Sequence, residues 1–131
     1  MRRTALATAL AAAACPAFAG DTNPVALIGR YSAEAGKAAD STAGKAFFLE
    51  THAGGKPDTP SCKTCHTMDP TQAGRTRAGK PIEPLAPRVN GDRFTDSAKV
   101  EKWFGRNCNS VLGRACSSSE KANIIAYLNS L

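Results

Sequence analysis

Long apolar runs, alternating strand patterns and internal repeats are all missing from this 131-residue sequence. After residue 19, no segment approaches the roughly 20 consecutive apolar residues that a membrane-spanning helix needs. The missing alternation argues against a β-sheet protein, and the missing repeats argue against a solenoid or a propeller. At this length, the chain has room for one small helical domain.

The sequence also lacks a stripe of basic residues interleaved with aromatic residues, although its formal net charge is +6. If Arg2 and Arg3 are removed with an export signal, 15 basic side chains remain against 11 acidic ones, which gives +4. An excess of this size is typical of a solvated surface or of a face that docks another protein. We therefore expect no nucleic-acid binding.

Residues 1–19 have the features of an export signal. A charged start is followed by a run of alanine and leucine, and Ala17-Phe18-Ala19 is a small-x-small cleavage site before Gly20. The apolar run is too short and too rich in alanine to span a bilayer. We therefore expect a mature domain over residues 20–131, located in the periplasm and not inserted into a membrane.

Five cysteines are present, and Cys15 falls within this signal. In an alternative interpretation Cys15 is the acylated residue of a lipoprotein signal, but Ala12 stands where leucine is usual. The mature chain keeps an even number of cysteines, for which two disulfides would be the ordinary expectation in an exported protein. These four are Cys62, Cys65, Cys108 and Cys116.

Two of the four lie in the segment Cys62-Lys63-Thr64-Cys65-His66, which is the C-x-x-C-H pattern of covalent haem attachment. Thiols three positions apart can add to the two vinyl groups of one porphyrin, and the next residue can then bind the iron. A thioredoxin-like pair would follow a strand, and a zinc site would need a second closely spaced pair of ligands. The motif therefore predicts one haem c, held by Cys62, Cys65 and His66.

Cys108 and Cys116 enclose seven residues, and we expect them to form a disulfide. Two free thiols, or a thiolate ligand to iron, would fit an oxidising compartment poorly. Closing this short loop would stabilise the fold by roughly 2 to 3 kcal/mol. The disulfide would also stiffen the chain beside it.

Apolar spacing and capping residues predict four helices and no strand. The helices run from Pro24 to about Gly36, from Asp40 or Ser41 to about Thr51, from near Thr95 or Asp96, and from the capping box of Ser117 and Glu120. Residues 71–87 contain three prolines, so we expect a long ordered loop that wraps the haem. Arg77 and Arg88 are candidate partners of the haem propionates.

This order of helix, haem motif, long loop and helices resembles a class I cytochrome c, an all-α fold wrapped around one covalent haem. In that family, a glycine and an aromatic residue on the helix before the motif pack against an aromatic residue on the last helix. Gly44, Phe48 and Tyr127 match these positions by type and spacing. The resemblance implies that the two helices cross closely.

The methionine that completes iron coordination in ordinary class I cytochromes c is missing. Met68 lies two residues after His66, so it is tethered to the proximal side. His52, Lys99 and Lys102 are alternative ligands. However, a loop histidine is commonly solvated, and a lysine would first have to lose its proton.

Asn107 is the remaining candidate for the distal ligand. It follows Val100, Trp103 and Phe104 at helical spacing, so its amide would face the interior beside Cys108. The competing interpretation is a helix end, because Gly105-Arg106-Asn107 is typical of a C-terminal cap. Taken alone, these residues favour the cap.

Three segments resemble the sphaeroides haem proteins, a family of oxygen-binding, high-spin class I cytochromes c with an asparagine as distal ligand and a disulfide beside it. The segments are residues 54–62, 92–98 and 106–111, and the similarity extends over residues 20–131. The resemblance implies that His66 is the proximal ligand, Asn107 the distal ligand, and Cys108 to Cys116 the disulfide. It also implies electron transfer with another cytochrome, such as a dihaem c-type protein.

Such a site would be gated by the redox state of the iron. An amide oxygen is a hard, weak donor that suits ferric iron better than ferrous iron, so reduction should release Asn107 and admit O2, NO or CO. Trp103 and Phe104 would line the distal pocket and keep it dry.

The alternative is a small oxidase, peroxidase or NO or nitrite reductase. Such an enzyme needs a distal acid or base. Glu101 is the nearby candidate, but by helical spacing it points away from the face that carries Asn107. We therefore expect a binding and electron-transfer protein and not an enzyme.

Overall fold

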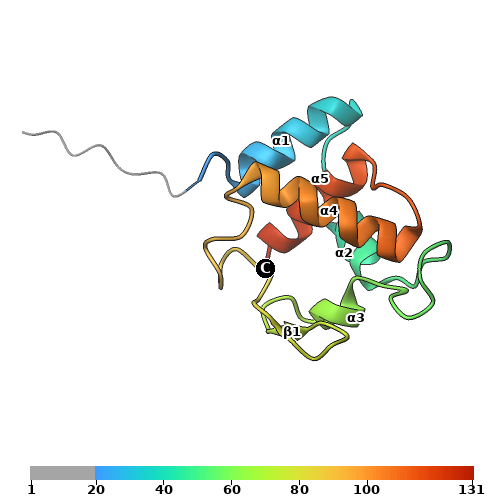
Figure 1. Cartoon of the computed structure of the whole chain (residues 1–131). Coiled ribbons are helices and arrows are strands. Elements are labelled where there is room, and N and C mark those ends of the chain that lie inside the picture. The colour runs from blue at the N-terminus through green and yellow to red at the C-terminus, as the bar shows by residue number, and fades with distance from the viewer. Residues whose placement is uncertain (1–19) are drawn as a thin grey trace, which may run out of the picture.

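The structure is a computed structural model that describes residues 20–131, so the predicted export signal and Cys15 lie outside the described residues. Five helices and two short strands make up the described chain (Figure 1). The longer helices gather on one side of the molecule, and α3 and β1 lie on the other. No helix in the described range is long and apolar enough to cross a membrane. The prediction of an all-α fold is confirmed, apart from the strand pair.

Three helices share one apolar core: α1 (Pro24–Ala35), α4 (Ser97–Leu112) and α5 (Ser118–Asn129). Each begins after a residue whose side chain accepts a hydrogen bond from a free backbone N–H, namely Asn23, Asp96 and Ser117. The buried side chains of this core are Leu27, Tyr31, Val100, Ala122 and Ile125. Their helical spacing gives each helix one apolar face, and burial of these faces packs the three helices together.

The second helix, α2 (Ser41–Leu49), crosses α5 at close range. A Cβ atom on Gly44 would lie 1.9 Å from the carbonyl oxygen of Asn123, so the two backbones meet where no side chain would fit. One turn further along, the buried ring of Phe48 lies 5.7 Å from the ring of Tyr127, centroid to centroid. The close crossing implied by these residues is confirmed.

The fourth helix is longer than expected. It continues through Gly105 and Asn107 to Leu112, and Gly113 then adopts a left-handed φ of 70°. A glycine inside a helix costs only about 1 kcal/mol, and burial of Val111 and Leu112 contributes more than that, at about 1.5 to 3 kcal/mol for each side chain. The interpretation of Asn107 as a helix-end residue is therefore wrong.

The haem motif forms the single turn α3 (Lys63–His66), and the long proline-containing segment follows it. The prediction of no strand is wrong here, because β1 (Gly74–Arg75) pairs antiparallel with β2 (Pro81–Ile82). Two-residue strands are too short to produce an alternating pattern in the sequence. A Cβ atom on Gly74 would lie 2.0 Å from the carbonyl oxygen of Cys65, so the strand pair packs directly behind the motif.

Candidate functional site

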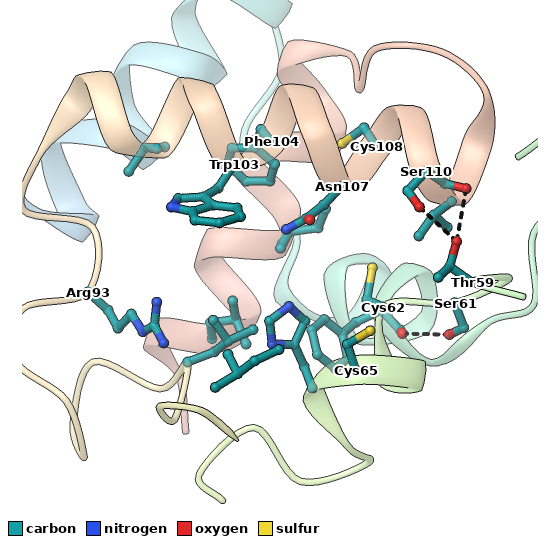
Figure 2. A pocket seen from close by; sticks show the side chains of 18 of the residues that line it. Thr59, Ser61, Cys62, Cys65, Arg93, Trp103, Phe104, Asn107, Cys108 and Ser110 are labelled. Carbon is teal, nitrogen blue, oxygen red and sulfur yellow. Dashed lines mark hydrogen bonds between the residues drawn. The ribbon is translucent and has the colours of Figure 1, made fainter. Parts of the chain in front are cut away.

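A cavity of about 420 Å³ lies between α3 and α4 (Figure 2). Its size falls within the roughly 300 to 1,000 Å³ of pockets that hold small molecules and cofactors. Most of the wall is apolar: Phe47, Phe48, Ile82, Leu85, Phe94, Val100, Trp103, Phe104, Val111, Leu112, Ile124 and Leu128. The loop before the haem motif, the segment between α3 and α4, and the helices α2, α4 and α5 all contribute to this lining. Most elements of the fold therefore border the cavity.

One wall of the cavity is formed by the haem motif. Cys62 and Cys65 carry free thiols, and both line the cavity together with His66. Burial raises the pKa of Cys62 to about 11, so this thiol is protonated at neutral pH. Burial, and secondarily the charge of Arg93, lowers the pKa of His66 to about 4. The His66 imidazole is therefore neutral near pH 7, which is the form that binds a metal.

The opposite wall is the inner face of α4. Figure 2 shows Trp103, Phe104 and Asn107 on α4, with Asn107 projecting into the cavity. The Asn107 amide faces the cavity, and no hydrogen bond joins it to the other residues drawn there. A neutral donor with unused hydrogen-bonding capacity therefore lies across the cavity from α3.

Trp103 and Phe104 contribute to this wall in different ways. Trp103 is 50% exposed, and the Lys102 ammonium and the Arg106 guanidinium lie 5.7 and 5.4 Å from its ring centroid. Phe104 turns inward, and its ring meets Tyr31 edge-on at a centroid distance of 6.3 Å. Both residues line the cavity, with Trp103 at its rim and Phe104 in its interior.

Two other side chains considered from the sequence lie outside the cavity. They are His52, an alternative distal ligand, and Met68, which is tethered to the proximal side. The Nε2 atom of His52 is 2.8 Å from the carbonyl oxygen of Phe47, and the two rings pack at a centroid distance of 4.5 Å. Met68 is 72% exposed on the α3 side. Neither side chain is placed to bind across the cavity from His66.

The two candidate lysines have other partners. Lys99 lines the cavity, but its ammonium lies 3.6 Å from the Asp96 carboxylate and its side chain is 75% exposed. Lys102 does not line the cavity and lies over the Trp103 ring. Among the residues named from the sequence as possible distal ligands, Asn107 alone is both neutral and directed into the cavity.

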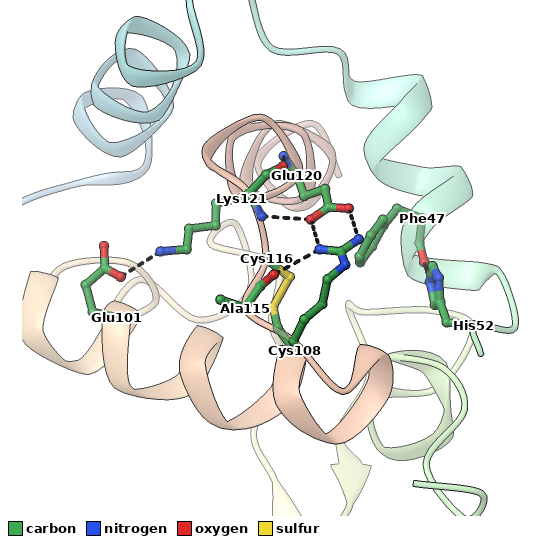
Figure 3. The surroundings of a disulfide bond; sticks show 10 residues. Phe47, His52, Glu101, Cys108, Ala115, Cys116, Glu120 and Lys121 are labelled. Atoms are coloured by element: carbon green, nitrogen blue, oxygen red, sulfur yellow. Dashed lines mark hydrogen bonds and ion pairs between the residues drawn. A yellow bond between two sulfur atoms is a disulfide. The ribbon is translucent and has the colours of Figure 1, made fainter. Parts of the chain in front are cut away.

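A disulfide joins Cys108 to Cys116, as expected, with Cα atoms 5.5 Å apart (Figure 3). It ties the residue that follows Asn107 to the chain just before α5. That chain is also held by Arg114, which donates two hydrogen bonds of 2.8 and 2.9 Å to the Glu120 carboxylate. The end of α4 is therefore fixed to the start of α5.

The loop before the haem motif packs on the other side of the same turn of α4. The Lys56 N–H donates to the carbonyl oxygen of Ser110 at 2.8 Å, and the Thr59 and Ser110 hydroxyls lie 2.7 Å apart. Gly55 allows this approach, because a Cβ atom there would lie 2.3 Å from the Ser110 carbonyl oxygen. The part of α4 that carries Asn107 is thus held between this loop and the disulfide.

Of the arginines proposed for the propionates, Arg77 lines the cavity and Arg88 does not. Arg77 already forms an ion pair with Asp58. The arginine that sequence reasoning missed is Arg93, which lines the cavity and is half-buried. Its only signal in the sequence was its place in the segment 92–98.

Glu101 points away from the cavity, as helical spacing indicated. Its carboxylate accepts hydrogen bonds from Arg30 at 2.8 Å, Tyr31 at 2.5 Å and Lys121 at 2.7 Å. Burial, and then the hydrogen bond to Glu101, raises the pKa of Tyr31 to about 12. This network stabilises the packing of α4 against α1 and α5, outside the cavity.

These donors fit a covalently bound haem. Two thiols at the spacing of the motif and a neutral imidazole lie on one wall of an apolar cavity, and an amide lies on the other. Within residues 20–131, no group of three or more histidine, cysteine or carboxylate side chains could hold a separate metal ion. The arrangement therefore suits an iron that is carried by a porphyrin.

Comparison with known proteins agrees with this chemistry. Residues 34–128 match a family described as a domain of unknown function, DUF1924. The cytochrome c-type protein SHP of Cereibacter sphaeroides is 63% identical and aligns with 86% of this chain and 88% of its own. Cytochrome c'' of Methylophilus methylotrophus is 44% identical, over 86% of this chain and 83% of its own.

Solved structures give the same grouping. The structure of oxidised SHP, an oxygen-binding cytochrome c, matches with a TM-score of 0.84 at 61% identity, covering 86% of this chain and 100% of that one. Oxidised cytochrome c'' matches with a TM-score of 0.68 at 44% identity, covering 82% of this chain and 93% of that one. The chain therefore belongs to the family of SHP and cytochrome c'', class I monohaem c-type cytochromes with one covalently attached haem c.

Proposed function

We propose that Asn107 closes the distal position of the haem in the ferric protein and leaves it in the ferrous protein, so that O2, NO or CO can bind there. His66 is the proximal ligand in this proposal, and Cys62 and Cys65 form the thioether bonds. The observation that carries the proposal is the direction of the Asn107 amide, which faces the cavity from the wall opposite α3.

The composition of the cavity wall supports a weak distal ligand. No methionine lines the cavity, and His66 is the only histidine among the lining residues. An amide oxygen is a hard donor without charge, so it favours the more highly charged ferric iron over ferrous iron. The bound haem supplies the iron that changes its oxidation state, and Asn107 supplies a bond that weakens on reduction.

Two relatives make this proposal reasonable for the family. Oxidised SHP is described as an oxygen-binding cytochrome c. A solution structure of cytochrome c'', 43% identical with a TM-score of 0.69, concerns the structural basis of haem-ligand detachment. Oxygen binding and ligand release are properties of those proteins, and the inward amide of Asn107 gives this chain a residue that could act as the ligand that is released.

The packing of α4 determines how Asn107 can move. The disulfide at Cys108 and the hydrogen bonds at Ser110 fix the backbone on the C-terminal side of Asn107. Opening by a shift of the helix would break these contacts, whereas rotation of the Asn107 side chain breaks none of them. We therefore assign the opening to side-chain rotation, after which the amide can donate a hydrogen bond to the incoming ligand.

An electron-transfer role in the periplasm completes the proposal, with a second cytochrome, such as a dihaem protein, as redox partner. The relatives bear cytochrome names.

Two carboxylates, Asp92 and Asp96, do line the cavity, a feature that the sequence did not indicate. However, Asp96 caps α4 by accepting from the Lys99 N–H and also pairs with the Lys99 ammonium, and Asp92 is exposed to solvent. The site therefore favours ligand binding with electron transfer over peroxide or oxygen cleavage, which needs a distal acid or base.

The direct test compares Asn107→Met with Asn109→Met, which lies on the same helix but outside the cavity. A thioether at position 107 should bind both iron states, give a low-spin ferric spectrum and slow CO uptake by the ferrous protein at least tenfold. Asn109→Met should behave as the wild type. Equal CO uptake by all three proteins, with unchanged ferric spectra, would contradict the distal role of Asn107.

A further inference from the structure

Arg93 is a half-buried cation on the cavity wall, and no carboxylate of the described chain forms an ion pair with it. Its Nε and Nη2 atoms donate to the carbonyl oxygens of Pro84 and Glu83, at 2.8 and 2.5 Å. Both carbonyls are neutral, so they fix the guanidinium without balancing its charge. Burying a charge is costly unless an opposite charge accompanies it, which indicates that Arg93 is placed for an anion.

The local backbone holds Arg93 in this direction. Its N–H donates to the carbonyl oxygen of Asn90 at 3.1 Å, and the next residue, Phe94, has a left-handed φ of 62°. That conformation is uncommon for a bulky residue and must be stabilised by its surroundings. Phe94 packs against two core clusters, which include Val100 and Phe48. The core therefore fixes the turn that directs Arg93 to the cavity.

The thiols define which edge of the haem Arg93 meets. Figure 2 shows Arg93 on the far side of the cavity from Cys62 and Cys65. The two vinyl groups of a haem, which form the thioether bonds, lie on the edge away from the two propionates. With the vinyl edge fixed at the cysteines, the propionates must lie on the side of the cavity that Arg93 occupies.

The other charged groups at the cavity are less suitable partners for these carboxylates. Lys99 is already paired with Asp96, and Arg77 is paired with Asp58. Asp92 lines the cavity too, but it carries the same charge as a propionate. Arg93 is the lining cation whose positive charge is not already paired within the described chain.

We propose that Arg93 binds a haem propionate and that this pair raises the reduction potential of the haem. The guanidinium has five N–H donors in a planar fork, and the two bonds to Pro84 and Glu83 leave others for a carboxylate. A fixed positive charge beside the haem disfavours the ferric state, which carries one more positive charge than the ferrous state. Removing that charge should therefore lower the potential.

The test measures the reduction potential of the holoprotein against pH for the wild type, Arg93→Gln, Arg93→Lys and Arg75→Gln. Arg75→Gln is the matched control, because it makes the same change in net charge. Arg75 lies in β1 outside the cavity, and its side chain donates to the Gly79 carbonyl oxygen. Ferric spectra and CO binding, recorded on the same samples, show whether iron ligation is preserved.

Arg93→Gln should shift the potential downward and make it depend on pH, because a propionate without its cation takes up a proton more readily. Arg93→Lys should lie between this variant and the wild type, since it keeps the charge but cannot bond both carbonyls and the carboxylate. Arg75→Gln should match the wild type.

If Arg93→Gln matched Arg75→Gln, the assignment would be wrong. If Arg93→Gln failed to accumulate as holoprotein, a wild-type potential and pH profile in Arg93→Lys would likewise overturn it. Neither result depends on whether Asn107 leaves the iron.

Discussion

At the level of single residues, the cavity presents a neutral imidazole on the α3 wall and a neutral amide on the α4 wall. Burial lowers the pKa of His66 from 6.5 to about 4, so the ring stays neutral in the folded protein until the pH falls to that value. Asn107 does not titrate at all. If His66 and Asn107 are the two ligands, no group bound to the iron changes its protonation between about pH 5 and pH 9.

We therefore predict that the ferric spectrum is constant over this pH range, because neither proposed ligand gains or loses a proton there. The measurement is an optical titration of the ferric holoprotein. A transition within this range would show that a group other than His66 and Asn107 binds the iron.

The individual site residues differ in how far the sequence could predict them. Cys62, Cys65 and His66 could be predicted because their function depends on spacing along one short segment. Residue spacing alone could not separate Asn107 from a helix cap, because its direction depends on where α4 ends, and only the resemblance to the sphaeroides haem proteins indicated it as the distal ligand. Arg93 could not be found, because a turn held by the packing of Phe94 directs it toward the cavity.

At the level of elements, the crossing of α2 and α5 positions the helix that leads into the haem motif. The Gly44 backbone lies against the Asn123 carbonyl, and the hydroxyl of Ser61, just before the motif, donates to the carbonyl oxygen of Phe48 at 3.2 Å. A change in the distance between these helices would therefore be transmitted to Cys62 through one hydrogen bond.

We predict that Gly44→Ala lowers the free energy of unfolding by about 1 to 3 kcal/mol, because a methyl group there forces the two helices apart. Gly29→Ala is the matched control, since Gly29 is exposed on α1 and a Cβ atom there would meet nothing within 4 Å. The control should be neutral or stabilise by about 0.4 to 1 kcal/mol. Chemical denaturation of the three holoproteins measures the difference, and equal stability of both variants would contradict the close crossing.

The disulfide also acts at the level of elements, because it joins the end of α4 to the start of α5. We predict that Cys108→Ser with Cys116→Ser lowers the free energy of unfolding by roughly 2 to 3 kcal/mol. The ferrous variant should bind CO at the wild-type rate, because rotation of the Asn107 side chain does not require the disulfide to open. Denaturation measures the first effect and rapid CO mixing the second, and a changed CO rate would contradict opening by rotation of the Asn107 side chain alone.

The elements themselves were predicted where a local signal marks their ends. Pro24, the capping box of Ser117 and Glu120, and the caps at Asp40 and Asp96 gave the starts of four helices. The end of α4 was missed because Gly105 resembles a stop signal, whereas burial of the following turn keeps the helix going. The strand pair was missed because two-residue strands leave no period in the sequence.

At the level of the whole molecule, the core is arranged around the cavity. Three clusters of buried side chains share one partly buried residue, Phe104, which packs against all of them. Phe104 also lines the cavity beside Asn107. Phe104 therefore connects the core to the wall that carries Asn107. The core holds the haem motif and α4 on opposite walls of the cavity, and in the proposed opening only the Asn107 side chain moves.

The measurement that tests this account most directly is rapid mixing of the wild-type ferrous holoprotein with CO, combined with the optical spectra of both oxidation states. We predict a high-spin ferric spectrum and a rate of CO binding that rises in proportion to the CO concentration. Proportionality is expected because Asn107 has already left the iron on reduction. A low-spin ferric spectrum, or a slow rate independent of CO concentration, would show that a strong ligand must first dissociate and would contradict the account.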